Sequence, residues 1–278
     1  VNLMKAAIVC SDRVTTVSQT YAQEIQTAFY GFRLDAVLRW NQGKVCGIVN
    51  GIDVDAFNPE TDPHLFKNYG INSLDDKKVN RSELLKMCGL EASDETMVIG
   101  MVGRLTSQKG LDLVQCVLND ILEKDVRMIV LGTGDYDYEQ MFMRAKWEHP
   151  DKISTNIMFS ADLANKIYAG CDLFLMPSLF EPCGLAQMIA MRYGTLPLVR
   201  ETGGLKDTVQ PYNQFTGEGT GFSFANYNAH EMLHVIEEAA ALFRHDQKAW
   251  RQMQCNAMNR DFSWDRSAQA YIDLYQGI

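Results

Sequence analysis

Residues 172–187 have the sequence Asp-Leu-Phe-Leu-Met-Pro-Ser-Leu-Phe-Glu-Pro-Cys-Gly-Leu-Ala-Gln. The apolar run Asp172–Pro177 predicts a buried strand, and a glycine at position 184 opens a predicted helix over 184–194. Glu181 lies in the loop between the strand and the helix. A strand followed at once by a helix is one step of a βαβ unit, so this stretch predicts an α/β fold.

The same alternation continues on both sides of this stretch. Apolar runs occur at Thr96–Val102, Arg127–Leu131, Ile153–Phe159 and Leu196–Arg200, and candidate helices lie at about 110–124, 135–148, 162–170 and 204–210. The predicted fold is a Rossmann-like open parallel sheet with helices on both faces. Such sheets bind ligands at the carboxyl ends of their strands, so the loops that follow the runs are the candidate site.

The ends of the chain differ from this pattern. Val14–Ser18 predicts a strand and Gln19–Phe29 a helix, a lone βα unit too small for a core of its own. The segment Asp75–Arg81 is charged and separates this unit from the sheet, and the tail from Ala229 is predicted helical. We expect the chain to be part of a longer protein, with a first helix that continues from upstream.

Composition excludes several classes of function. A net charge of −9 is unsuited to nucleic acid or to an anionic membrane surface, because both need an excess of Lys and Arg. No apolar run reaches the roughly 18 residues of a membrane span. The seven cysteines form no C-x-x-C pair, and reduced thiols in a cytoplasmic protein are the simplest interpretation.

The loop after the first strand of the sheet carries two cations. In Gly103-Arg104-Leu105-Thr106-Ser107-Gln108-Lys109-Gly110-Leu111, Arg104 offers a planar fork and Lys109 a point charge, a combination that suits a diphosphate. A solvated turn before a helix is the alternative. The cluster Gly132-Thr133-Gly134 also follows a strand, but it lacks a third glycine and favours a plain tight turn.

Two further loops complete the candidate site. Glu181 can accept hydrogen bonds from sugar hydroxyls, while the free N–H groups near Gly184 and Leu185 face the ligand. The alternative role for Glu181 is stabilisation of its own helix dipole. One strand later, Thr202-Gly203-Gly204 repeats the arrangement, and its glycines allow a close approach of the backbone. We expect the loops to converge on one crevice.

Taken together, these motifs resemble those of bacterial glycogen synthases and plant starch synthases. The similarity rests on Gly-Arg-Leu-Thr-x-Gln-Lys-Gly, Phe-Glu-Pro-Cys-Gly-Leu-x-Gln and Thr-Gly-Gly-Leu-x-Asp-Thr-Val, in that order, and extends over essentially the whole chain. It implies the C-terminal half of a GT-B glycosyltransferase. Residues 1–45 are then a remnant of the N-terminal domain, 46–260 the nucleotide-sugar-binding domain, and 261–278 a helix that crosses back.

The resemblance also implies a reaction. Such enzymes transfer glucose from ADP-glucose to the non-reducing end of an α-1,4-glucan with retention of configuration, with no metal or other cofactor expected. Arg104, Lys109 and Glu181 are the implied catalytic residues. The implied donor-binding residues are Gly103, Phe159, Cys183, Gly184, Leu185, Ala186, Thr202, Gly203 and Gly204. The location is cytoplasmic, as in bacteria, and a plastid is not excluded.

Three positions bear on the donor. Phe159 stands where the family usually has a tyrosine stacked on adenine, so the ring remains and the hydroxyl is lost. Ala186 replaces a frequent threonine near the phosphates. Ile189 stands eight residues after Glu181, where wider relatives carry a second glutamate, and this absence favours the glycogen and starch synthase branch.

Two rival interpretations remain. His230-Glu231-Met232-Leu233-His234 matches the zinc-peptidase pattern, but Asn228 is a good N-cap with Glu231 three residues later, which predicts an ordinary helix start. The stronger rival is a catalytically inactive binding module. In that case the chain holds ADP or ADP-glucose and lacks the groups that place the glucan acceptor.

Overall fold

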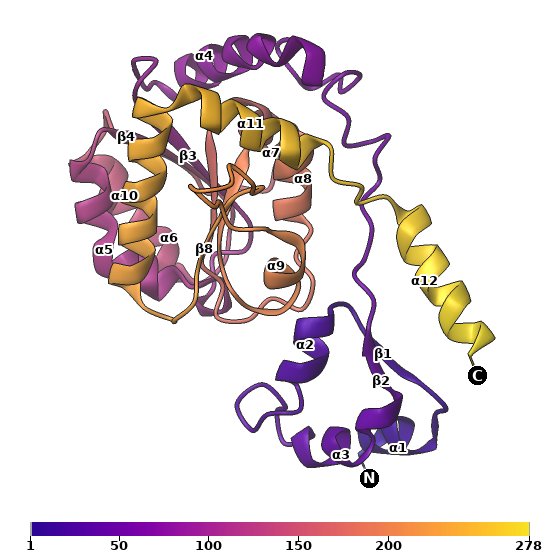
Figure 1. Cartoon of the computed structure of the whole chain (residues 1–278). Coiled ribbons are helices and arrows are strands. Elements are labelled where there is room, and N and C mark those ends of the chain that lie inside the picture. The colour runs from indigo at the N-terminus through magenta and orange to yellow at the C-terminus, as the bar shows by residue number, and fades with distance from the viewer. Residues whose placement is uncertain (1, 278) are drawn as a thin grey trace.

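The computed structural model describes residues 2–277, which form a large sheet domain, a small N-terminal unit and a final helix (Figure 1). The sheet has six parallel strands in the order β5-β4-β3-β6-β7-β8. Their bounds are β3 Met97–Val102, β4 Val126–Leu131, β5 Ile153–Asn156, β6 Leu173–Met176, β7 Leu196–Arg200 and β8 Phe222–Phe224. The five predicted strands are confirmed, and β8 was missed.

Helices cover both faces of this sheet. The connecting helices are α5 Leu111–Glu123, α6 Tyr136–Glu148, α7 Ala161–Gly170, α8 Ala186–Arg192 and α9 Gly203–Thr208, all close to the predicted positions. The tail forms α10 Ala229–His245 and α11 Gln247–Met258. Every connection between the parallel strands thus runs over the sheet through a helix, as parallel pairing requires.

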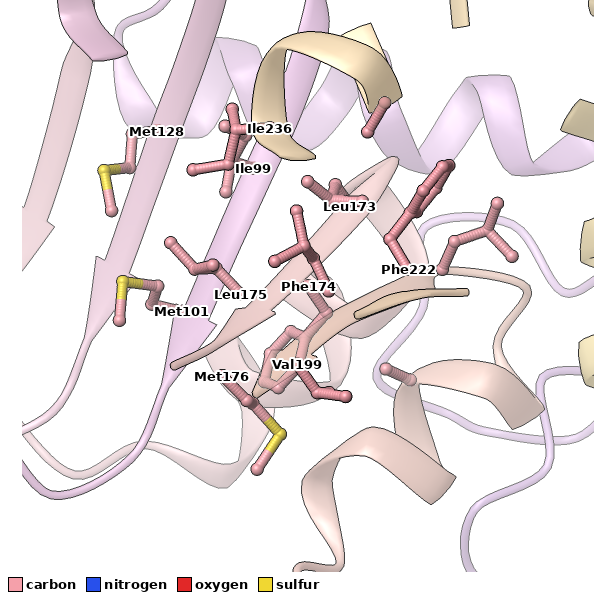
Figure 2. Close-up of a cluster of buried hydrophobic side chains, with 14 of the residues drawn as sticks. Ile99, Met101, Met128, Leu173, Phe174, Leu175, Met176, Val199, Phe222 and Ile236 are labelled. Atoms are coloured by element: carbon pink, nitrogen blue, oxygen red, sulfur yellow. The ribbon is translucent and has the colours of Figure 1, made fainter. Parts of the chain in front are cut away.

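Alternate residues of the strands pack on opposite faces. Ile99 and Met101 of β3 belong to the main core with Met128 and with Ile236 of α10, as Figure 2 shows. Val98, next to Ile99 in sequence, packs with Leu84 and other side chains on the opposite face. Two buried faces explain why these strands are continuously apolar in sequence.

The charged segment at 75–81 is not a separator, which corrects the prediction. A short 3-10 helix, η2 Ile71–Asp76, leads into α4 Lys77–Cys88, which packs on the sheet domain. Lys77 is buried and its Nζ donates to Thr195 Oγ1 at 2.7 Å. Arg81 is also buried and pairs with Asp172, Nε to Oδ2 3.2 Å. Both charged side chains are therefore buried and bonded to polar partners inside the fold, and the local sequence pattern does not predict this.

The N-terminal unit is small. It contains α1 Leu3–Cys10, β1 Val14–Thr16, α2 Gln19–Glu24, α3 Asp35–Trp40, η1 Gln42–Lys44 and β2 Val45–Gly47. The strand predicted at Val14–Ser18 corresponds to β1, which pairs in parallel with β2. The strand β2, at the predicted domain boundary near residue 45, was not predicted. The predicted helix is shorter than expected, because turns follow Glu24 and both Phe32 and Arg33 have left-handed backbone angles.

Two chain crossings join the unit to the sheet domain. Residues 47–52 and 259–263 meet where Ile52 N donates to Phe262 O at 2.8 Å. Ser267 of α12 (Trp264–Gln276) donates to Val49 O at 2.6 Å. At its far end α12 approaches the unit again, where Arg13 Nη2 donates to Gly277 O at 3.1 Å (Figure 1). Among residues 2–277, no helix is both long and apolar enough to cross a membrane.

Candidate active site

The candidate site lies at the point of the sheet where the order of the strands reverses. The chain moves outward from β3 through β4 to β5, and then returns to form β6 on the other side of β3. The loops that leave β3 and β6 therefore diverge at their carboxyl ends and leave a crevice there. These loops carry Arg104 and Lys109 on one side and Glu181 on the other.

The two loops are in direct contact through a glycine. Gly110 has a φ of 72°, and a Cβ at this position would lie 2.0 Å from Pro177 O. Only glycine combines a left-handed backbone with so close an approach. Gln108 adds hydrogen bonds, since its carbonyl accepts from Leu179 N at 2.9 Å and its Nε2 donates to Phe180 O at 3.3 Å. The loops are therefore fixed relative to each other.

Lys109 and Glu181 meet across this contact. Lys109 Nζ lies 2.5 Å from Glu181 Oε2, with side chains 24% and 9% exposed. Ser178, also buried, donates from Oγ to the same carboxylate oxygen at 3.2 Å. The Glu181 carboxylate is therefore fixed in position by two donors, the ammonium of Lys109 and the hydroxyl of Ser178.

A cavity of about 100 Å³ opens over this pair, and we call it the inner cavity. Its walls include Arg104, Lys109, Ser178 and Glu181 together with apolar side chains from the ends of β3 and β6. Gly103, Gly184, Leu185 and Ala186 also line it. The inner cavity thus combines two cations, one carboxylate and the start of α8.

A second cavity of about 360 Å³, the outer cavity, adjoins the first. It is lined mostly by apolar groups, including Phe57, Met158 and Phe159, and by Gly132 and Thr133. Phe159 is 92% exposed, so one face of its ring is free for a planar ligand. Val102, Gly103, Arg104 and Leu131 line both cavities. Arg104 therefore lies at the boundary between the two cavities, beside any ligand that extends from one into the other.

Comparisons with known proteins agree with this geometry. The family model for glycosyl transferases group 1 matches residues 89–257, and the model for the starch synthase catalytic domain matches residues 1–40. The first match covers more than half of the chain. The chain belongs to the group 1 glycosyltransferases.

Individual relatives of this glycosyltransferase are glycogen synthases. The chain is 52% identical over its full length to one from Clostridium acetobutylicum and 54% identical to one from Clostridium beijerinckii, and it covers 58% of each. It therefore spans little more than half the length of these relatives.

Solved structures show the same relationship. The catalytic domain of starch synthase IV from Arabidopsis thaliana, bound to ADP and acarbose, superposes with a TM-score of 0.93 and 37% identity over 99% of this chain and 57% of that one. HepE from Anabaena in complex with UDP and glucose has a TM-score of 0.67 at 19% identity, covers 98% of this chain and 65% of that one, and shows only the shared fold. The parallel sheet of the glycosyltransferase is that of the GT-B fold.

Four predicted donor-binding residues lie outside both cavities of the glycosyltransferase. A Cβ on Gly203 would meet Glu181 O at 2.0 Å, and one on Gly204 would meet Cys183 O at 1.9 Å. Thr202 Oγ1 donates to Glu24 Oε1 of α2 at 2.8 Å. The Cys183 thiol is buried, which raises its pKa. Gly203 and Gly204 thus pack against the backbone of the Glu181 loop, and the role of Thr202, Gly203 and Gly204 in donor binding stays a prediction.

The zinc-peptidase pattern belongs to an ordinary helix start. Asn228 Oδ1 accepts from His230 N at 2.9 Å and from Glu231 N at 3.0 Å. The Glu231 carboxylate turns back to Ala225 N at 2.8 Å. Within residues 2–277, no three His, Cys, Asp or Glu side chains are grouped so that they could hold a metal ion.

The sequence analysis missed Ser178 and the supporting residues Gln108 and Arg200. A serine and a glutamine occur in many loops, and nothing in their sequence distinguishes them. Arg200 ends an apolar run next to an acidic residue, which suggests a surface position, yet it is buried. Its only sequence signal is its place at a strand end beside the predicted site.

Proposed function

We propose that this chain is the donor-binding half of a glycogen or starch synthase, which transfers glucose from ADP-glucose to the non-reducing end of an α-1,4-glucan. The observation that carries the proposal is the pairing of Lys109 with Glu181 in a cavity that adjoins an aromatic-lined cavity at Arg104. The glycogen synthase relatives and the starch synthase bound to ADP and acarbose support it.

The two cavities fit the two ends of a nucleotide sugar. The outer cavity takes the base, which stacks on Phe159, and the inner cavity takes the glucose, whose hydroxyls bind Glu181. The diphosphate then lies at their shared wall, between Arg104 and Lys109. No metal is required in this arrangement, because the two side-chain cations lie where negative charge collects on the departing ADP.

The number of carboxylates in the inner cavity bears on how the anomeric configuration is retained. Glu181 is the only Asp or Glu among the described residues that line the inner cavity, so a paired nucleophile of the kind found in retaining glycosidases has no candidate here. The C1–O bond to ADP breaks as the acceptor hydroxyl bonds to C1 from the same face. The hydroxyl proton passes to the departing diphosphate. Arg104 and Lys109 stabilise this transition state more than the bound substrate.

A binding module without catalysis is the second candidate. It is favoured by the chain's coverage of only 58% of its glycogen synthase relatives, because acceptor placement and closure need groups outside the donor site. The cytoplasm remains the proposed location, supported by seven cysteines that all have free thiols.

The decisive experiment is titration calorimetry of this chain with ADP, UDP and ADP-glucose, alongside a glucan-elongation assay. ADP should bind more tightly than UDP, and Lys109→Ala or Arg104→Ala should weaken ADP binding by tenfold or more, roughly the loss of one charged hydrogen bond. In a full-length glycogen synthase that carries the same residues, either change or Glu181→Gln should lower turnover by about a hundredfold. Binding of neither nucleotide would refute the proposal, and binding without elongation selects the inactive module.

A further inference from the structure

A buried arginine lies directly beneath the loop that carries Glu181. Arg200 is the last residue of β7 and is 7% exposed. Its Nε donates to Ser178 O at 2.9 Å, and its Nη2 donates to Leu179 O. Both acceptors are backbone carbonyls in the segment that joins β6 to Glu181. The guanidinium therefore holds this segment at two consecutive peptide groups.

Burial of the Arg200 guanidinium costs free energy of solvation, which points to a role beyond packing. Arg200 forms no salt bridge with a carboxylate among residues 2–277. Its neighbours are neutral carbonyls, the hydroxyl of Tyr30 at 3.1 Å and the ring of Tyr227 at 5.6 Å. A buried guanidinium without a counter-ion is unfavourable unless its hydrogen bonds are well made. Here those bonds are made to the segment that sets the position of Glu181.

The contact with Tyr30 extends this support to the N-terminal unit. Tyr30 lies in the turn after α2, and its neighbour Phe32 packs edge to face on Phe180, with ring centroids 5.9 Å apart. Phe32 has a φ of 47° and Arg33 a φ of 71°, a strained pair for residues with side chains. This turn of the unit thus contacts the Glu181 loop directly, through Phe32 on Phe180, and contacts it indirectly through the hydrogen bond between Tyr30 and Arg200.

We propose that Arg200 is a positioning residue for Glu181, and that Tyr30 couples its orientation to the docking of the N-terminal unit. This inference rests on the proposed function, since it concerns the sugar end of the donor site. Arg200 lines neither cavity and acts through Ser178 and Leu179. Arg104 and Lys109, which are proposed to hold the diphosphate, lie on the other loop. Loss of Arg200 should therefore affect the sugar more than the nucleotide.

The test compares affinities for ADP-glucose and ADP by calorimetry in three variants of this chain. Arg200→Lys keeps the charge but cannot reach both carbonyls, so the ratio of ADP-glucose affinity to ADP affinity should fall about tenfold. Tyr30→Phe should lower the ratio about threefold. Arg127→Lys is the matched control, because Arg127 also binds backbone carbonyls, those of Glu91 and Val126, at a distant part of the sheet. Its ratio should equal that of the parent.

Hydrogen exchange separates this inference from the proposed function. In Arg200→Lys the amides of residues 178–185 should exchange at least about tenfold faster than in the parent and in Arg127→Lys, whether or not a nucleotide binds. An unchanged affinity ratio in a folded Arg200→Lys, or unchanged exchange in that segment, overturns the positioning role. If Arg200→Lys does not fold, Tyr30→Phe provides the test. An unchanged ratio of ADP-glucose affinity to ADP affinity in that variant also overturns the positioning role.

Discussion

The sheet domain and the N-terminal unit are stabilised in different ways. The sheet domain has a large main core, which contains most of the buried apolar side chains of residues 2–277, and a second cluster on the opposite face of the sheet. The buried cluster of the unit consists of Ile8, Val37 and Leu38. The unit is held instead by polar contacts to α9, where Asp207 accepts from Ser18 Oγ at 2.6 Å and from Thr20 Oγ1 at 2.5 Å. The difference shows that the candidate site lies in a domain with a large core of its own and is contacted from one side by a unit with a very small one.

The largest expected effect tests the two cores against each other. Phe174 of β6 is fully buried in the main core, and Phe174→Ala should lower the free energy of unfolding of the sheet domain by about 3–5 kcal/mol. Leu38→Ala in the unit should leave that main transition unchanged. Urea denaturation followed by tryptophan fluorescence measures both. A comparable loss in the two variants would show that the regions unfold as one.

The next effect concerns the contact between the two site loops. Gly110→Ala adds a Cβ to a left-handed residue 2.0 Å from Pro177 O, so it should cost about 3 kcal/mol and weaken ADP binding. Gly89→Ala is the control, because Gly89 has a similar φ of 68° and open space around it. It should cost only the strain of about 1–2 kcal/mol and leave binding intact. Equal losses would remove the steric argument.

A smaller effect follows from the buried amine of α4. Burial lowers the pKa of Lys77 to about 8. Between pH 8 and about 10 the unfolded chain keeps a proton on Lys77 that the folded chain has lost, so Lys77 should contribute a rise of about 2 kcal/mol to the free energy of unfolding. The buried thiols of Cys88, Cys171 and Cys183 oppose this rise in the same window, because burial raises their pKa values. Lys77→Met should lack this rise. Above that window the buried tyrosines act oppositely, because their pKa values are raised and they stay protonated when folded. If the parent and Lys77→Met show the same pH dependence in melts at pH 7 to 10, the assignment is wrong.

The smallest effect concerns docking of the unit. Asp207→Asn should weaken the contact with α2 by about 1.5 kcal/mol, because its hydrogen bonds lose a charged acceptor. Limited proteolysis should then cleave residues 2–47 about tenfold faster, while the melting of the sheet domain stays unchanged. Asp273→Asn, on exposed α12, is the control and should match the parent. Cleavage at the parental rate would show that other contacts dominate docking.

The sequence predicted the sheet well because each strand there is long and apolar enough to stand out. It failed at β8, which has only three residues, and at α4, whose Lys77 and Arg81 suggest a solvated surface. Burial of these charges depends on partners distant in sequence, Thr195 and Asp172. Local pattern carries no information about such partners.

The candidate site divides in the same way. Arg104, Lys109 and Glu181 were predicted because they lie in loops that follow predicted strands, where open parallel sheets bind ligands, and because their motifs resemble those of glycogen and starch synthases. Thr202, Gly203 and Gly204 follow a strand as well, and their glycines lie against the backbone of the Glu181 loop. A glycine indicates a close approach and does not say what approaches. The distinction needs three-dimensional structure.

The paired crossings at 47–52 and 259–263 limit how the unit can be displaced. Ile52 N donates to Phe262 O, Ser267 of α12 donates to Val49 O, and Arg13 of the unit donates to Gly277 O. The unit is therefore attached to the sheet domain covalently through residues 47–52 and by hydrogen bonds through α12. When its contacts to α9 are broken, these two attachments still hold it near the surface that it left.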